Sequence, residues 1–240
     1  MTKQSDIDEF IEFIEDASDI LRPAGVLLSM TVHYIYHVLF PTRVFTDLVD
    51  RVNIMTYDII EPRKGEGGGK RRKKRTYYEH HASIDKVKQS IQSFIDDGCP
   101  KHKIIVGIPE YGRHEENPNS IKTFAEIYDE MSEDERTAIL QKKTDSNTNT
   151  KSNYSWNGYL YDPPDVIRQK VKLVLEDMNV GGIFFWELGQ DKQHETIAPG
   201  GILLETAYDE VTQLVRKKSN MKNDRENDGI STSSNDDEEL

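Results

Sequence analysis

Apolar residues recur along the first 215 residues in two alternating patterns. One repeats every three or four residues and predicts amphipathic helices over 5–21, 41–50, 84–98, 165–178 and 202–215. The other is a short apolar run and predicts buried strands over 26–32, 51–58, 103–109 and 183–185, the first expected to be buried on both faces. Helices that alternate with strands in this way are typical of a parallel sheet with crossover helices, so the sequence predicts an α/β fold.

Three segments break the alternation. Residues 61–75 combine a glycine triplet with a run of lysine and arginine, which indicates a nuclear-localisation or polyanion-binding patch or, as the favoured interpretation, a solvated loop. Residues 114–155 predict an inserted subdomain or lid, with a helix over 120–140. Residues 217–240 contain almost nothing apolar, which predicts a disordered acidic tail after a domain of residues 1–216.

Composition narrows the classes of partner. The net charge of −12 argues against nucleic acid, and the absence of any apolar run of about 18 residues argues against a membrane span. The single cysteine, Cys99, excludes an internal disulfide and a cysteine-cluster metal site. The N-terminal residues do not have the pattern of a secretory signal.

Three of the predicted strands end in an aromatic residue beside a charged one. The pairs are Tyr57 with Asp58, Tyr111 with Arg113, and Trp186 with Glu187. The carboxyl ends of parallel strands are where ligands bind in α/β folds, and aromatic faces beside carboxylate and guanidinium groups suit sugars. A carbohydrate cleft is therefore the leading hypothesis, and the alternative is that these aromatic side chains belong to the core.

The dipeptide His80-His81 invites a metal-site interpretation. Adjacent histidines point in different directions on any regular element, and no third ligand has the spacing of a zinc site. We interpret both as loop residues, and the sequence predicts neither a metal nor a cofactor.

Three motifs carry a resemblance to a known family. They are MTYD at 55–58, GIPEYGR at 107–113 and GGIFFWELGQD at 181–191. In this order they resemble successive signatures of the family 18 glycoside hydrolases, the chitinases and chitinase-like proteins. The resemblance covers about residues 5–215 and implies a (β/α)₈ barrel, of which these strands resemble the fifth to eighth, with the small insertion after strand seven. Glu110 departs from the pattern, because the family usually has an aromatic residue there.

A further departure concerns the acidic signature of the family, Asp-x-x-Asp-x-Asp-x-Glu. Its glutamate protonates the glycosidic oxygen, and the acetamido group of the substrate attacks in place of an enzyme nucleophile. The signature does not occur in the sequence, and the stretch Asp6-Ile7-Asp8-Glu9 has the wrong spacing and lies on a predicted helix. The sequence is therefore expected to be the C-terminal half of the barrel and, as it stands, inactive as a chitinase.

The resemblance also implies roles for individual residues. Tyr57 would hydrogen-bond the acetamido carbonyl, and Asp58 would bind a sugar hydroxyl near the acid. Trp186 would form the floor on which N-acetylglucosamine stacks, while Met55, Tyr111 and Arg113 would line the cleft. The implied partner is chitin or an N-acetylglucosamine oligosaccharide, with no nucleic acid and no membrane.

Three hypotheses stay open at this point. The chain is a chitinase represented by an incomplete sequence, a non-catalytic chitin- or glycan-binding relative, or a degenerate fragment that does not fold alone. The family implies secretion, although the chain itself opens without a signal peptide. Nothing in the sequence indicates an oligomeric state.

Overall fold

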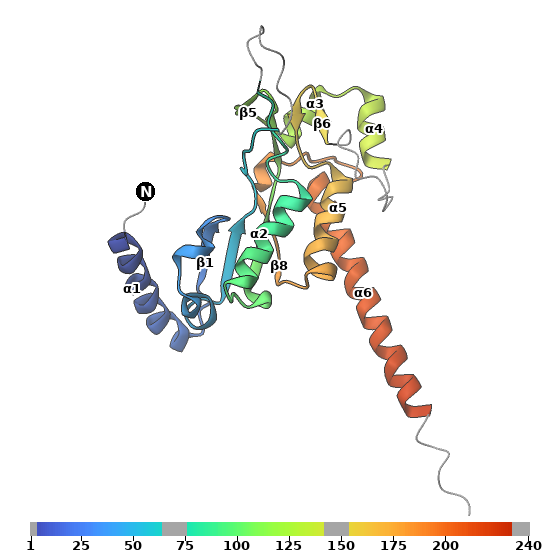
Figure 1. The fold of residues 1–240 in the computed structure, drawn as a ribbon. Helices are drawn as coiled ribbons and strands as arrows, with labels where there is room; N and C mark the ends of the chain where they lie inside the picture. Colours follow the sequence, from blue (N-terminus) through green and yellow to red (C-terminus); the bar gives the residue numbers. More distant parts are fainter. Residues whose placement is uncertain (1–3, 64–75, 142–153, 232–240) are drawn as a thin grey trace, which may run out of the picture.

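A computed structural model describes residues 4–63, 76–141 and 154–231 (Figure 1). The lysine- and arginine-rich run at 70–75, part of the predicted insertion and the end of the predicted tail lie outside these residues. The chain forms a parallel sheet flanked by helices, a second and smaller sheet above it, and a long C-terminal helix that projects away from the body (Figure 1).

The larger sheet has four strands in the order β1-β2-β3-β8, and every neighbouring pair is parallel. The strands are β1 Ser29–His33, β2 Arg51–Met55, β3 Ile104–Pro109 and β8 Gly182–Trp186. Because the strands are parallel, their carboxyl ends lie at the same edge of the sheet. The predicted α/β fold is confirmed.

The helices between the strands follow the predicted order. They are α1 Gln4–Leu21, α2 Ile84–Asp96, α5 Pro164–Lys172 with the π-helical turn Leu173–Asp177, and α6 Ile202–Ser231. The helix predicted over 41–50 is a shorter π-helical turn, Val44–Leu48. Further 3₁₀ turns lie at Arg22–Ala24, Tyr36–Leu39, Lys101–Lys103 and Leu188–Gln190.

One face of the sheet carries most of the apolar core. Met30, Val32, Val52 and Ile54 alternate along β1 and β2 and pack with buried residues of α1 and α2. The opposite face of β1 is exposed at Thr31, so the prediction that this strand is buried on both faces is wrong. The reason is that the buried residues of the described helices α1 and α2 pack with Met30 and Val32, on one face of β1.

The insertion after β3 is built around an antiparallel sheet with the strand order β5-β4-β7-β6. Its elements are β4 Tyr111–His114, β5 Asn117–Thr123, α3 Phe124–Glu130, α4 Glu133–Gln141, β6 Ser155–Trp156 and β7 Tyr159–Leu160. The helix predicted over 120–140 is confirmed in part: α3 and α4 are helical, whereas residues 120–123 belong to strand β5. A capping box between Thr123 and Glu126 starts α3, and the residues before it pair with β4.

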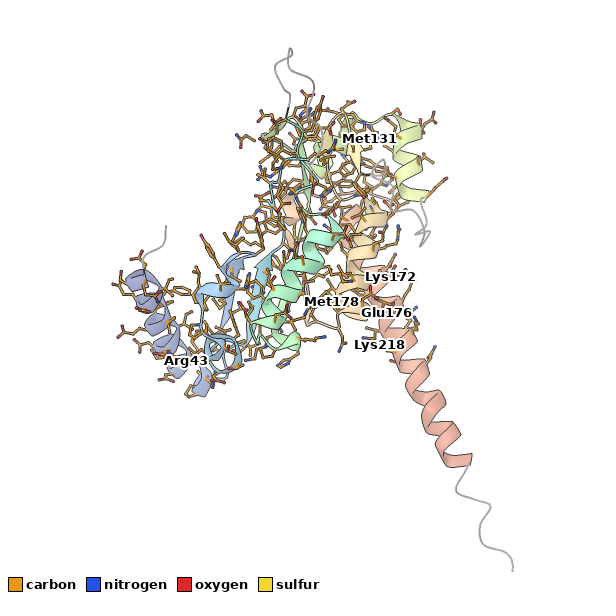
Figure 2. The ribbon with its side chains drawn as sticks, viewed as in Figure 1. Arg43, Met131, Lys172, Glu176, Met178 and Lys218 are labelled. Carbon is orange, nitrogen blue, oxygen red and sulfur yellow. The ribbon has the colours of Figure 1, made fainter. Side chains whose placement is uncertain are left out.

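Helix α6 continues to Ser231, past residue 217, where the sequence predicts a disordered tail. That prediction is wrong for residues 217–231. The helix is already nucleated by its buried first turns, so further polar residues extend it at little cost. Lys217 pairs with Glu176, and the Lys218 ammonium donates to the Leu175 carbonyl at 3.0 Å, which holds α6 against the turn after α5. Figure 2 labels Glu176 and Lys218 in this part of the molecule.

No helix in the described part of the chain combines the length and the apolar character that a membrane crossing needs.

Candidate functional site

The site begins where β2 ends. The Thr56 hydroxyl donates to the buried Gly107 carbonyl at 2.6 Å, which ties the end of β2 to β3. Two residues later Asp58 adopts a left-handed backbone conformation, with φ of 59°. This conformation is uncommon outside glycine, although aspartate tolerates it better than most residues. Asp58 is thereby turned out of the strand direction at the carboxyl edge of the sheet.

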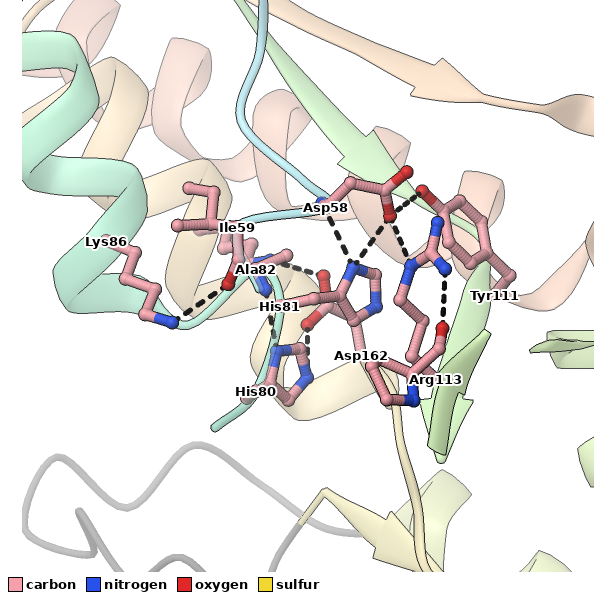
Figure 3. A network of polar contacts seen from close by, with 11 residues as sticks. Asp58, Ile59, His80, His81, Ala82, Lys86, Tyr111, Arg113 and Asp162 are labelled. Atoms are coloured by element: carbon pink, nitrogen blue, oxygen red, sulfur yellow. Dashed lines mark hydrogen bonds and ion pairs between the residues drawn. The ribbon is translucent and has the colours of Figure 1, made fainter. Parts of the chain in front are cut away.

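The Asp58 carboxylate is the centre of a hydrogen-bond network (Figure 3). Its Oδ1 accepts from the Tyr111 hydroxyl at 2.7 Å and from Arg113 Nε at 2.5 Å. His81 Nδ1 lies 3.4 Å from the same oxygen and 3.3 Å from the Asp58 backbone nitrogen. Arg113 also donates to the Pro118 carbonyl at 2.6 Å, so its guanidinium is held from both ends.

These contacts fix the charge of the network. Burial alone would raise the pKa of Asp58, but the contacts with His81, Arg113 and Tyr111 outweigh it and hold the pKa well below its ordinary value. Burial, followed by the neighbouring Asp58, raises the pKa of Tyr111. Asp58 is therefore an ionised acceptor at neutral pH and Tyr111 a neutral phenol, so the carboxylate can accept from a hydroxyl ligand but cannot donate a proton.

Tyr57, the residue before Asp58, lies in an aromatic cluster. It is buried and makes edge-on contacts with Tyr111 and Phe184, with ring centroids 6.3 and 6.4 Å apart. A Cβ atom at Gly107 would come within 2.7 Å of the Tyr57 ring and 2.8 Å of the Phe184 ring, so only glycine allows the rings this close to β3. Burial raises the pKa of Tyr57 to about 12, which keeps its hydroxyl protonated.

Of the two other predicted site residues, one packs against this cluster and the other stands apart from it. Met55 is partly buried and packs against the cluster of Tyr57 and Tyr111. Trp186 ends β8 in register with Pro109, and its side chain is 51% exposed. The structure thus brings Tyr57, Asp58, Tyr111 and Arg113 together, while Trp186 stands apart on the neighbouring strand end.

The histidine pair is part of the network, which sequence reasoning missed. His80 and His81 lie in a loop, as predicted, but both are buried, and their rings stack with centroids 5.3 Å apart. His80 Nε2 lies 3.0 Å from the Tyr161 carbonyl oxygen, and its Nδ1 accepts from the Ala82 backbone at 3.0 Å. Burial lowers the pKa of His80 to about 3, so the ring is neutral at physiological pH. The His80-His81 dipeptide itself was the only feature of the sequence that could have indicated this part of the network.

A buried ion pair contacts the histidine pair through His80. Lys170 of α5 and Asp162 both have fully buried side chains and are hydrogen-bonded to each other. The other Asp162 oxygen lies 3.3 Å from His80 Nε2. A continuous series of side-chain contacts therefore links α5 to the strand-end network. It runs from Lys170 through Asp162, His80 and His81 to Asp58.

Glu110 is the single residue between the last residue of β3, Pro109, and the first residue of β4, Tyr111. Its side chain is fully buried, and neither carboxylate oxygen has a hydrogen-bond partner among the described residues. Burial, with the nearby charges of Asp191 and Glu187, raises the pKa of Glu110 to about 8. The carboxyl group is therefore neutral at pH 7, in a position without access to solvent.

The described ranges 4–63, 76–141 and 154–231 contain no group of three or more His, Cys, Asp or Glu side chains that could hold a metal ion. The strand ends offer an ionised acceptor, a guanidinium, two phenols and a half-exposed indole. Such a set can hydrogen-bond hydroxyl and amide groups and stack on a sugar ring.

Comparison with known proteins agrees with this geometry. The family model described as Glycosyl hydrolases family 18 matches residues 1–191. Endochitinase 1 of Metarhizium robertsii is 26% identical over 161 residues, which cover 61% of this chain and 37% of the relative.

Two solved structures share the fold. The GH18 chitinase ChiB of Flavobacterium johnsoniae has a TM-score of 0.60 at 21% identity, over 85% of this chain and 55% of its own. A mutant class V chitinase of Cycas revoluta, solved in complex with (GlcNAc)3, has a TM-score of 0.61 at 19% identity, over 87% of this chain and 64% of its own. The chain therefore spans less than two thirds of each of these relatives.

Proposed function

Because the chain belongs to family 18 of the glycosyl hydrolases, we propose that it forms part of a chitinase-type domain that binds N-acetylglucosamine oligosaccharides at the strand ends. The observation that carries the proposal is the Asp58 network, in which an ionised carboxylate, a phenol and a guanidinium are held in place beside an aromatic cluster. The neighbouring indole of Trp186 is half-exposed and is the group proposed to stack on a sugar.

The four parallel strands would correspond to the fifth to eighth strands of the family's barrel. In support, the sheet is parallel with strand order β1-β2-β3-β8, and the antiparallel insertion follows β3, the third of these strands. This chain covers 55% and 64% of the two solved chitinases. The uncovered parts of those chitinases are long enough to hold the further strands that a closed barrel needs.

In the complete reaction of the family, hydrolysis proceeds with retention and with assistance from the substrate's acetamido group. In this proposal the Tyr57 hydroxyl donates to the acetamido carbonyl and stabilises the charge that develops on it. Its pKa of about 12 suits a donor that must stay protonated. Asp58 binds a sugar hydroxyl, and Met55, Tyr111 and Arg113 line the cleft.

The residues of this chain do not supply the general acid of that reaction. The acidic signature is not in the sequence, Asp58 is held ionised, and the neutral carboxyl group of Glu110 is fully buried. We therefore propose glycan binding, without hydrolysis, for the 240 residues on their own. The second candidate, favoured by the absence of the acidic signature from the sequence, is a non-catalytic chitin-binding relative of the chitinases.

Replacing Trp186 with alanine tests the binding proposal. We expect about a tenfold loss of affinity for penta-N-acetylchitopentaose, because the sugar loses an aromatic face worth about 1–1.5 kcal/mol. Tyr208→Ala is the matched control, since Tyr208 is an aromatic residue of α6 that is 68% exposed and is not one of the proposed cleft residues. Isothermal titration calorimetry on both variants measures the difference, and equal affinities would place the glycan elsewhere.

A further inference from the structure

The left-handed turn at Asp58 is held by the loop that carries His81. The Asp58 backbone N–H donates to His81 Nδ1 at 3.3 Å, and the next backbone N–H, that of Ile59, donates to the His81 carbonyl at 2.9 Å. The Ile59 carbonyl in turn accepts from the Lys86 ammonium at 2.9 Å (Figure 3). His81 therefore fixes the peptide groups on both sides of Asp58, one through its side chain and one through its main chain.

The His81 ring is itself fixed in position. The residue is 2% exposed, and its ring stacks with two others. The ring centroids are 5.3 Å from His80 and 5.1 Å from Tyr111, and the planes differ by 1° and 27°. Rotation of the ring about its Cβ–Cγ bond would break both stacks, so Nδ1 stays beside Asp58.

Nδ1 of His81 faces two groups with opposite requirements. It lies 3.3 Å from the Asp58 backbone nitrogen and 3.4 Å from Asp58 Oδ1. A neutral imidazole carries one hydrogen, so Nδ1 either accepts from the N–H or donates to the carboxylate. Burial lowers the pKa of His81, which keeps the ring neutral at pH 7. Nε2 is buried without a hydrogen-bond partner among the described residues, so the contacts of Nδ1 decide between the two tautomers.

Two observations favour the tautomer that carries its hydrogen on Nε2. Asp58 Oδ1 already accepts shorter bonds from the Tyr111 hydroxyl at 2.7 Å and from Arg113 Nε at 2.5 Å, so a third donor at 3.4 Å would add little. The Asp58 N–H points at His81 Nδ1, and a partly buried backbone donor that lost this acceptor would cost free energy. The left-handed conformation of Asp58, which aspartate adopts at a cost, then depends on this bond.

We propose that His81 is a positioning residue of the strand-end site, a role that rests on the function proposed above. As the tautomer with its hydrogen on Nε2, His81 accepts the Asp58 N–H and stabilises the left-handed turn. The turn aims the Asp58 carboxylate at a hydroxyl group of the ligand. His81 acts through Asp58 and, because it is buried, needs no contact with the ligand.

The tautomer can be measured on the wild-type protein without any ligand. We expect long-range proton–nitrogen NMR spectra at pH 7 to show a hydrogen on Nε2 of His81 and none on Nδ1. A hydrogen on Nδ1 would overturn the proposal, because that nitrogen would then donate to the carboxylate and could not hold the Asp58 N–H.

Two substitutions of His81 separate its hydrogen bond from its stacked ring. His81→Asn places an oxygen acceptor near the position of Nδ1 and removes the ring, whereas His81→Phe keeps a ring and removes the acceptor. We expect His81→Phe to weaken binding of penta-N-acetylchitopentaose roughly tenfold and to speed hydrogen exchange of the Asp58 amide roughly tenfold. His81→Asn should stay within about threefold of the wild type in both measurements.

His37→Phe is the matched control, because His37 Nδ1 also lies beside an aspartate, 2.7 Å from Asp97 Oδ2, and His37 is not a residue of the strand-end network. It should change neither measurement. Equal losses in His81→Asn and His81→Phe would overturn the proposal, and so would wild-type behaviour of His81→Phe. If His81→Phe does not fold, the wild-type tautomer and His81→Asn decide.

Failure of the proposed function would look different. A wild-type protein that binds no oligosaccharide would refute glycan binding at the strand ends. The tautomer of His81 and the exchange rate of the Asp58 amide would still show whether His81 holds Asp58 in place.

Discussion

Glu110→Gln will stabilise the protein at pH 9 by about 3–5 kcal/mol in the free energy of unfolding, and by less than about 1 kcal/mol at pH 4. The Glu110 carboxyl group is fully buried without a hydrogen-bond partner among the described residues, and its pKa is raised from 4.5 to about 8. Glutamine has nearly the same shape and no charge, so it removes the ionisation and leaves the packing in place.

The direction of the pH dependence follows from the protons bound in each state. Between pH 4.5 and about 8 the folded protein holds a proton on Glu110 that the unfolded chain has released. This contribution to stability is full below pH 4.5 and falls as pH rises to about 8, above which the loss is complete. Urea unfolding of the wild type and of Glu110→Gln at pH 4, 6 and 9 measures it.

Glu12→Gln is the matched control, because Glu12 is an exposed carboxylate on α1. Its effect should stay within about 0.5 kcal/mol at every pH. If the free energy of unfolding of Glu110→Gln depended on pH as strongly as that of the wild type, the carboxyl group of Glu110 would have to be solvated or paired.

Lys170→Met and Asp162→Asn will each destabilise the protein by about 3–5 kcal/mol. Both side chains are fully buried, so removal of one partner leaves the other as an uncompensated charge in the core. Burial lowers the pKa of Lys170, which means that the ammonium depends on Asp162 to stay charged. Asp162→Asn also changes the neighbour of His80 Nε2, 3.3 Å away, and loosens the support of the histidine pair.

The double variant Asp162→Asn/Lys170→Met should lose much less than the sum of the single losses, since it leaves no buried charge unpaired. Lys217→Met is the surface control, because Lys217 pairs with Glu176 with 60% of its side chain exposed, and it should cost less than about 1 kcal/mol. Thermal and urea unfolding measure these effects. Additive losses would contradict the account of a single coupled pair.

The strand-end part of the site follows from the sequence because it depends on local order. Parallel strands bring their carboxyl ends to one edge, so Asp58 and Tyr111 could be predicted to lie near each other before any contact was known. The structure adds the left-handed backbone at Asp58 and the hydrogen bond of 2.7 Å between them. Most of the helices could be placed by their apolar periodicity, and the insertion by the break in the alternation of helices and strands.

The remainder depends on contacts that a local pattern does not contain. His81 reaches Asp58 across 23 residues, and Lys170 becomes a core residue only because Asp162 is buried with it. Residues 117–123 form β5 because β4 offers a partner, which overrides the helical appearance of the segment after 120. The burial of Glu110 is likewise a property of the packed structure, although its departure from the family's aromatic residue was visible in the sequence.

The central claim is that the strand ends form a site for N-acetylglucosamine oligosaccharides. The most direct test is calorimetric titration of the 240-residue protein with penta-N-acetylchitopentaose and, separately, with cellopentaose, which has the same backbone without acetamido groups. We predict that the chito-oligosaccharide binds at least tenfold more tightly than the cello-oligosaccharide, and that the sample releases no reducing ends. Equal affinity for both sugars, or binding of neither, would contradict the account.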